Sequence, residues 1–385
     1  MLKRILGFVS VASLLAVSQA TLAAVMATSA PADTTTAPAP QTNFNRQVVH
    51  HAPSNVATAQ PTGVGYYFTS DDYHPYVGIE TSYEYFQVPE FGMGSASNNG
   101  IQSKTVFNDT ANKFVFIPKL YAGYHFQNHF LPMLFGQHAD VEFNFSWFNT
   151  GREDKDGTTK RGSTWVINPG DPGPQPTAAW LRNYQHRLFL RYRNVAVYYR
   201  GHHETSNPHL VMSPFVGAVY TYLDQQNRAQ LDYSSDGSTW LLVNKIDRED
   251  VSTSYYGLSF GNNLNYLFTT HLSSQLNIEA QVLRAVSNLD ALQHPNLGGN
   301  TNSITVHNTN AKYTYRAIVS WGMAYTFTSS PASPQLYANV GVDRWGYIGE
   351  IKNPRGTAET NKARIIDDAN YNPFVTVGIR VPLVM

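Results

Sequence analysis

The chain has 385 residues, and its 27 acidic residues balance 27 lysines and arginines, so no net charge calls for nucleic acid or another polyanion. Charged residues make up only 14% of the chain, below the ~25% usual for soluble domains, whereas Tyr (24) and Phe (20) are abundant. This composition suits a protein with much surface hidden from water. The absence of cysteine excludes disulfides, thiolate metal sites, a cysteine nucleophile and a lipoprotein anchor.

The N-terminus has the form of a secretory signal peptide over residues 1–23. Lys3 and Arg4 precede the apolar run 5–17, and small residues at 18–20 or 21–23 fit a cleavage site. A transmembrane anchor is the alternative, but the apolar run is shorter than the about 20 residues that a spanning helix needs. Residues 24–70 are rich in Pro, Thr and Ala and predict a disordered leader.

Beyond residue 70, apolar and polar residues alternate in about ten segments. In residues 140–148 the odd positions are apolar and nearly all even positions polar, so a strand would carry the two kinds on opposite faces. The repetition predicts an all-β protein. The segments are 77–85, 116–126, 140–148, 186–200, 210–222, 256–266, 275–282, 313–327, 336–343 and 375–383.

The fourth of these segments, 186–200, does not keep one phase. Its first half sets two leucines and a tyrosine against Arg187, Arg191 and Arg193, and the apolar residues change phase near Asn194. Such a slip predicts a β-bulge near Asn194. We therefore assign the three arginines to the polar face that the other segments carry.

The connections alternate between short and long, as in an antiparallel up-and-down transmembrane barrel. Ten strands are expected; twelve, with the hairpin 228–245 in the membrane, is the main alternative, and eight a further one. Asp236-Gly237 predicts a hairpin that projects beyond the membrane. Short turns are expected near 127–137, 201–209, 267–274 and 328–334, and long loops near 89–112, 151–183, 224–253, 288–311 and 348–372.

Either face of the alternating strands could be the buried one. In a soluble sandwich the aromatic face forms the core, whereas in an outer-membrane barrel it meets lipid and the polar face lines the interior. Two segments, 256–266 and 313–327, begin and end their apolar face with Tyr or Phe, as at the aromatic girdles of membrane barrels. The segments are also long enough to span, since a tilted membrane strand needs about 9–11 residues. These features favour the barrel.

The C-terminal strand FVTVGIRVPLVM carries a resemblance to the Gram-negative outer-membrane β-barrel proteins. The resemblance covers the chain from about Pro75 to Met385, within a predicted barrel domain of residues 71–385, and is also carried by the signal peptide and the aromatic ends of the strands. Members of this family usually end in Phe after apolar residues at every second position, a signal that the barrel assembly machinery reads. Ile379, Val381 and Leu383 fit this pattern, but the last residue is Met385. The resemblance implies a location in the outer membrane, with lipid, lipopolysaccharide and the assembly machinery as partners.

The inward face of the predicted barrel carries both signs of charge. One interpretation is a lumen closed by ion pairs; the other is a narrow polar channel in which an arginine rung at 187, 191 and 193 faces acidic strands and guides small solutes. Ten strands enclose little more than the eight-stranded interior that side chains can fill. The expected lumen residues are Glu80, Glu84, Lys119, Asp140, Glu142, Arg187, Arg191, Arg193, Glu279, Arg316, Asp343 and Arg380.

Some loop residues are candidates for catalytic groups, because ten-stranded barrels include the omptin proteases. Asp154 and Asp156 could share a face and orient a water, with Asp290 and His294 as an acid-base couple. The first pair lies in a charge-rich loop for which solvation is the simpler explanation, and the Asp-His spacing differs from that of omptins. No catalytic role carries over.

Two histidine motifs are further candidates for a catalytic or metal-binding site. His271 and Ser273 resemble a lipid-A deacylase motif, but the predicted topology places them in a periplasmic turn, at the wrong end for outer-leaflet chemistry. His202-His203-Glu204 could suggest a metal, but adjacent histidines on a turn diverge. No enzyme, cofactor or metal is expected. The sequence favours a surface-exposed structural or interaction protein whose loops meet a host or environmental ligand, with a porin-like channel as the alternative and an outer-membrane hydrolase behind both.

Overall fold

The computed structural model describes the barrel and the strands attached to it. The described residues are 60–62, 66–68, 74–87, 91–98, 101–109, 113–128, 132–156, 160–167, 177–207, 209–234, 236–294, 304–327, 333–352 and 364–383. The predicted signal peptide and most of the predicted leader lie outside them. Within that leader, β1 (Gln60–Thr62) and β2 (Tyr66–Phe68) form a small antiparallel pair, where we predicted no regular structure.

Ten antiparallel strands form a closed barrel, so the prediction of an all-β, ten-stranded barrel is confirmed and the twelve- and eight-stranded alternatives are wrong. Each strand pairs with the next in chain order, and the pairing of the last strand with the first closes the ring. The strands are β3 (His74–Phe86), β6 (Lys113–Gln127), β7 (His138–Asp156), β9 (Thr177–Glu204), β10 (Leu210–Ser234), β11 (Leu241–Leu267), β12 (Leu272–His294), β13 (Ile304–Thr326), β14 (Gln335–Lys352) and β15 (Arg364–Pro382).

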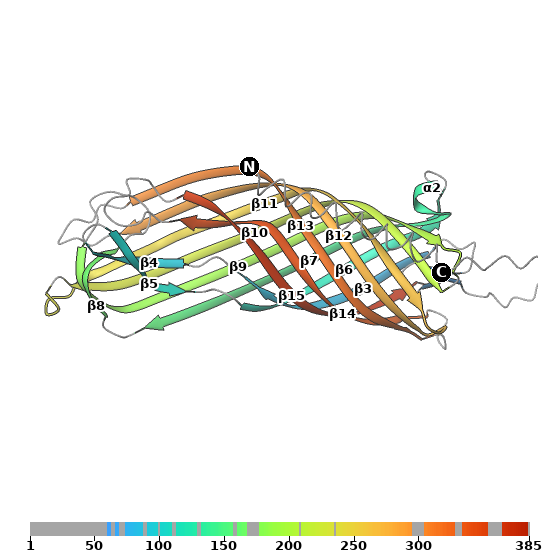
Figure 1. Cartoon of the computed structure of the whole chain (residues 1–385), viewed down its shortest axis with the longest axis horizontal. Coiled ribbons are helices and arrows are strands. Elements are labelled where there is room, and N and C mark those ends of the chain that lie inside the picture. Colours follow the sequence, from blue (N-terminus) through green and yellow to red (C-terminus); the bar gives the residue numbers. More distant parts are fainter. Residues whose placement is uncertain are drawn as a thin grey trace, which may run out of the picture. The chain divides into compact units, whose positions relative to one another are not determined.

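The two ends of the barrel differ, as Figure 1 shows. At one end, here the turn end, short connections follow β6, β9, β11 and β13, and α2 (Pro132–Phe135) lies in the first of them. At the other, here the loop end, three further strands extend the sheet: β4 (Phe91–Asn98), β5 (Ile101–Asp109) and β8 (Lys160–Ile167). Among the described residues no helix has both the length and the apolar character to cross a membrane.

Strands occupy most of the residues that we predicted as long loops. The hairpin of β10 and β11 continues to Ser234 and Leu241, so the segment predicted as a loop near 224–253 is mainly paired strand. The other predicted loops are also shortened by the neighbouring strands. The loop prediction was wrong there because outside the membrane a strand no longer needs an apolar outer face, and its alternation weakens.

Toward the turn end, the outward side chains are apolar and the inward ones polar. On β7, Phe143 is 48% exposed, whereas Glu142 and Asn144 beside it are buried. This is the distribution expected when lipid surrounds a polar interior. The exposed apolar residues, here the apolar band, include Val77, Ile79, Tyr83, Phe116, Leu120, Val141, Phe143, Val197, Val216, Leu258, Val319, Trp321, Val340, Val377 and Ile379.

Toward the loop end the distribution is reversed. Leu188, Leu190 and Tyr192 of β9 are buried inside, and the residues between them are exposed. A barrel surrounded by water needs this arrangement, because only its interior shields apolar side chains from water. This part, here the loop-side extension, comprises residues 177–193, 223–234, 241–253 and 287–294 of β9 to β12 and their neighbours.

The reversal corrects two predictions about β9. Arg187, Arg191 and Arg193 are exposed on the outer face, so the predicted arginine rung in the lumen is wrong. The predicted bulge is wrong as well: β9 pairs in continuous register with β7 and β10 across Asn194. The phase of the apolar residues changes because the surroundings of the strand change there, and the backbone continues regularly.

Candidate functional site

A polar cavity of about 230 Å³ lies inside the barrel at the height of the apolar band. Asp140, also predicted to face the lumen, is fully buried toward the turn end. Eight of the predicted lumen residues line the cavity: Glu80, Glu84, Lys119, Glu142, Glu279, Arg316, Asp343 and Arg380.

Ion pairs in the cavity join neighbouring strands and also strands that are distant in sequence. Arg316 Nη2 of β13 lies 2.6 Å from Asp343 Oδ2 of β14, and Trp345 Nε1 also donates to that oxygen at 2.9 Å. Glu142 of β7 accepts from Arg380 of β15 at 2.8 Å. Each of these charges therefore has a partner of opposite sign inside the barrel.

Arg200 completes this network and was missed by the sequence analysis. Its Nη1 lies 3.4 Å from Glu142 Oε2, the oxygen that also accepts from Arg380. Its inward position follows from unbroken alternation along β9, because Tyr198, Arg200 and His202 then share one face. The assumed bulge hid that signal.

Tyrosine side chains fill the interior where neighbouring strands carry glycine. The ring of Tyr121 covers Gly78, where an added Cβ would lie 2.1 Å from it, and Tyr337 covers Gly378 in the same way at 2.3 Å. The hydroxyls of Tyr121 and Tyr337 lie 3.2 Å apart, and Tyr337 donates to Glu80 at 2.8 Å. The large rings therefore occupy lumen space and satisfy inward carboxylates together.

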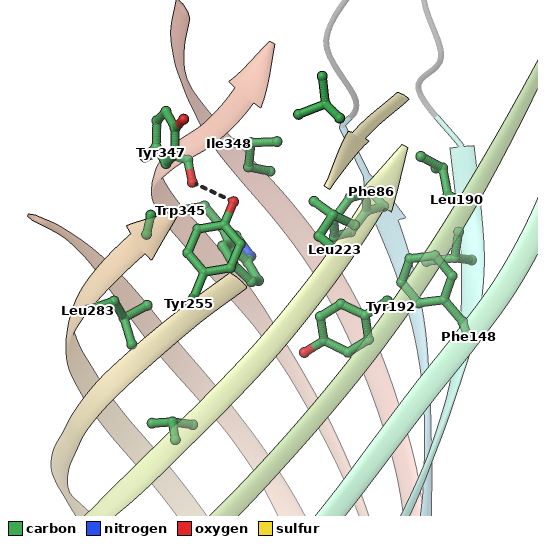
Figure 2. Close-up of a cluster of buried hydrophobic side chains, with 14 of the residues drawn as sticks. Phe86, Phe148, Leu190, Tyr192, Leu223, Tyr255, Leu283, Trp345, Tyr347 and Ile348 are labelled. Carbon is green, nitrogen blue, oxygen red and sulfur yellow. Dashed lines mark hydrogen bonds between the residues drawn. The ribbon is translucent and has the colours of Figure 1, made fainter. Parts of the chain in front are cut away.

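An aromatic and aliphatic cluster, here the apolar plug, fills the interior on the loop side of the cavity (Figure 2). Phe148 stacks on Tyr192 at 5.2 Å, and Tyr255 packs edge-on against Trp345 at 5.0 Å. The Tyr255 hydroxyl donates to the carbonyl oxygen of Tyr347 at 3.2 Å. The plug comprises Phe86, Phe148, Leu190, Tyr192, Leu223, Tyr255, Leu283, Trp345, Tyr347 and Ile348, all of them buried.

A second feature, here the turn-end cluster, consists of His125 of β6, Asp140 of β7 and His202 of β9. His125 Nδ1 lies 2.6 Å from Asp140 Oδ1, and His202 Nε2 lies 3.0 Å from Asp140 Oδ2. The three residues are 1%, 0% and 5% exposed. Their potential ligand atoms all lie within 4.8 Å of one another, close enough to hold one metal ion.

The structure also places the other histidine motifs. His203 points away from His202 and contacts the carbonyl oxygen of Leu134 at 2.8 Å, as adjacent residues on one strand require. His271 Nδ1 contacts the carbonyl oxygen of Thr326 at 3.2 Å in the turn before β12. Both contacts are to backbone carbonyl oxygens, and neither is to a side chain considered as a catalytic partner of these histidines.

Of the acidic residues considered as catalytic groups, Asp290 has described side-chain contacts. Asp290 lies on β12, 2.8 Å from Arg248 and 3.2 Å from His307, in a partly exposed group at the loop end. The side chains of Asp154, Asp156 and His294 lie outside the described residues. The described contacts of Asp290 are those of a surface ion-pair cluster.

Closed antiparallel strands, an apolar outer band and a polar interior define the class: the chain is an up-and-down β-barrel of the Gram-negative outer-membrane type. No protein-family model and no curated protein sequence matches it.

Solved structures of outer-membrane barrels match the chain at low TM-scores. They include the outer-membrane protease OmpT from Escherichia coli, at 11% identity and a TM-score of 0.37, which covers 82% of this chain and 98% of that one. The toluene transporter TodX of Pseudomonas putida has 9% identity and a TM-score of 0.23, covering 86% and 93%. A FadL homologue of Pseudomonas aeruginosa has 8% identity and a TM-score of 0.24, and the match covers 85% of this chain and 93% of that one. At such TM-scores these likenesses assign neither substrate nor activity.

Proposed function

We propose that the protein is a surface-exposed structural or interaction protein of the Gram-negative outer membrane, with a closed interior and no enzymatic activity. The apolar plug is the observation that carries this proposal. Conduction of ions requires a continuous path of water, and buried aromatic rings interrupt it on the loop side of the cavity. The signal peptide at 1–23 directs the chain across the inner membrane.

The loop-side extension is the part that acts at the cell surface. β9 to β13 contain 23 to 28 residues each, more than twice the about 9–11 that a tilted strand needs to cross a bilayer. The extra length carries the polar outer face and the β4–β5 hairpin beyond the membrane. A host or environmental ligand binds there.

The apolar band and the last strand have partners of their own. Outer-membrane lipid and lipopolysaccharide surround the exposed apolar side chains. The barrel assembly machinery engages β15, whose residues Val375, Val377 and Ile379 face outward at every second position. No nucleic-acid partner is proposed, since the chain has no net charge.

A narrow channel for small polar solutes is the second candidate, because the cavity of about 230 Å³ is lined by charges of both signs. Planar-bilayer recording of the purified, refolded chain tests the choice. The closed barrel predicts no reproducible unit openings for the native chain. Steady unit openings of the native chain would overturn the proposal in favour of the channel.

A plug variant makes the recording specific. Removing side chains from the plug with Leu223→Ala and Tyr255→Ala together should produce openings, because both side chains are fully buried within it. Leu258→Ala is the matched control, since that side chain is 61% exposed on the outer face. The control should remain as silent as the native chain.

A further inference from the structure

The turn-end cluster brings together three side chains that transition metals favour. His125 and Asp140 are directly paired in the register of β6 and β7, and His202 lies on β9, the other neighbour of β7. All three face the interior within a few residues of the ends of their strands. Two imidazoles and one carboxylate form a donor set that suits Zn²⁺ and neighbouring divalent metals.

The geometry around His202 is that of a metal ligand with its other nitrogen held in place. His202 Nδ1 lies 3.2 Å from the hydroxyl oxygen of Ser213, which is fully buried on β10. In the tautomer in which Nδ1 donates to this oxygen, Nε2 carries the lone pair that can bind a metal. Ligating histidines usually make such an outer hydrogen bond.

The contact between His202 and Asp140 is close but poorly aligned for a hydrogen bond. Nε2 lies 3.0 Å from Asp140 Oδ2, yet this buried nitrogen has no partner with hydrogen-bond geometry. Two ligands of one tetrahedral Zn²⁺ lie ~3.4 Å apart, since each is about 2.0–2.1 Å from the ion. Small movements of the two side chains would therefore be enough for both to bind one cation.

The buried arginines of the network are paired with another carboxylate. Arg200, the register partner of Asp140, and Arg380 both form ion pairs with Glu142. The hydroxyl of Tyr76 lies 3.5 Å from Asp140 Oδ2 and 2.8 Å from Glu142 Oε2. A divalent ion would thus meet one carboxylate, two imidazoles and an adjacent polar hydroxyl.

We propose that His125, Asp140 and His202 bind one divalent transition-metal ion, with Zn²⁺ as the representative probe, inside the barrel at its turn end. The ion joins β6, β7 and β9 where their short connections begin. This inference does not depend on whether the barrel conducts. A His-Asp ion pair without metal is the competing explanation of the same contacts.

The test measures metal binding by the folded, tag-free chain in detergent micelles after treatment with a chelator. Equilibrium dialysis should find one tightly bound Zn²⁺ per folded chain. Co²⁺ should give the visible d–d bands of a low-coordinate imidazole-carboxylate site. Absence of stoichiometric Zn²⁺ binding and of these bands in the native chain would overturn the proposal, whatever the variants do.

Variants locate the ion. His202→Ala should abolish stoichiometric binding, and Ser213→Ala, which keeps every ligand, should weaken it by about 10–100-fold. His203→Ala is the matched control, because this adjacent histidine faces the other way and should bind as the native chain does. Undiminished binding by folded His202→Ala, with folding verified by heat-modifiable gel mobility, would also overturn the assignment.

Discussion

At the scale of single residues, the same outward-pointing side chain has different surroundings at different heights of the barrel. Phe143 on β7 and Phe189 on β9 are 48% and 41% exposed on the outer face. Phe143 lies in the apolar band among apolar neighbours, whereas Phe189 lies in the loop-side extension between two exposed arginines. Their exposure is nearly equal, and only the solvent differs.

A pair of substitutions measures this difference. Phe143→Arg should lower the free energy of unfolding by roughly 2–4 kcal/mol, because the charge would lie near the bilayer midplane. Phe189→Arg should change it by about 0.5 kcal/mol or less, as at an ordinary water-exposed site. Urea unfolding of chains refolded into lipid vesicles provides both values. Equal losses at the two positions would refute the boundary that we place between them.

Inside the barrel, the pair of Arg316 and Asp343 behaves as a unit. The guanidinium donates through Nε at 2.9 Å and through Nη2 at 2.6 Å, and both residues are buried. Arg316→Met should therefore lower the free energy of unfolding by roughly 3–5 kcal/mol, because it leaves a buried carboxylate unpaired.

Adding Asp343→Asn to Arg316→Met should restore much of that loss, since the amide needs no counter-charge and its oxygen can still accept from Trp345. The unfolding free energies of the two single variants and the double variant form the thermodynamic cycle. Strictly additive effects would show that the two side chains do not stabilise the barrel as a pair.

At the scale of elements, the β10–β11 hairpin ends in a turn that Asp236 holds. Hydrogen bonds to its carboxylate from the backbone N–H groups of Thr239 (2.7 Å) and Ser238 (2.8 Å), with another from the Ser234 hydroxyl, keep the pKa of Asp236 below its ordinary value. Gly237 in the same turn has a φ of 80°, which favours glycine. These features support the hairpin that Asp236-Gly237 predicted.

The lowered pKa gives the turn a pH dependence of known sign. Because the folded-state pKa lies below the unfolded value of about 3.9, the stabilising contribution is complete above that pH and is lost as pH falls below it. Amide exchange at Ser238 and Thr239, corrected for intrinsic rates, should be slow at pH 6 and accelerate below about pH 4. Asp236→Ala should show the fast exchange at both pH values; pH-independent protection in the native chain would contradict this.

β9 shows how far the sequence predicts an element of this barrel. Its alternation predicts which residues share a face, but it does not say which face lies inside, because that depends on whether lipid or water surrounds the strand. The apolar residues at 188, 190 and 192 were assigned outward and lie inside. β9 crosses the boundary between lipid and water, so the rule that apolar residues face outward fails on one side of that boundary.

The turn-end cluster illustrates the same limit for the site. Asp140 was predicted to face inward, and the short turn between β6 and β7 makes His125 its register partner. His202 could have been added only with unbroken alternation through Asn194. The ion pairs between distant strands depend on the ring closing with a particular register and stagger, which alternation within one strand does not contain.

At the scale of the whole barrel, the central claim is that lipid surrounds only its turn-side part. Val197 and Arg191 on β9 test this directly, because both point outward and lie six residues, or about 20 Å, apart along one strand. The chain has no cysteine, so Val197→Cys and Arg191→Cys each provide a single position for a fluorescent label.

The decisive measurement is quenching of the two labels by bromine-labelled lipid tails after refolding into vesicles. We predict strong quenching at position 197, where the native side chain is 44% exposed in the apolar band, and none at position 191, where the outer face meets water. Equal quenching at both positions, or quenching at 191 without quenching at 197, would contradict the account.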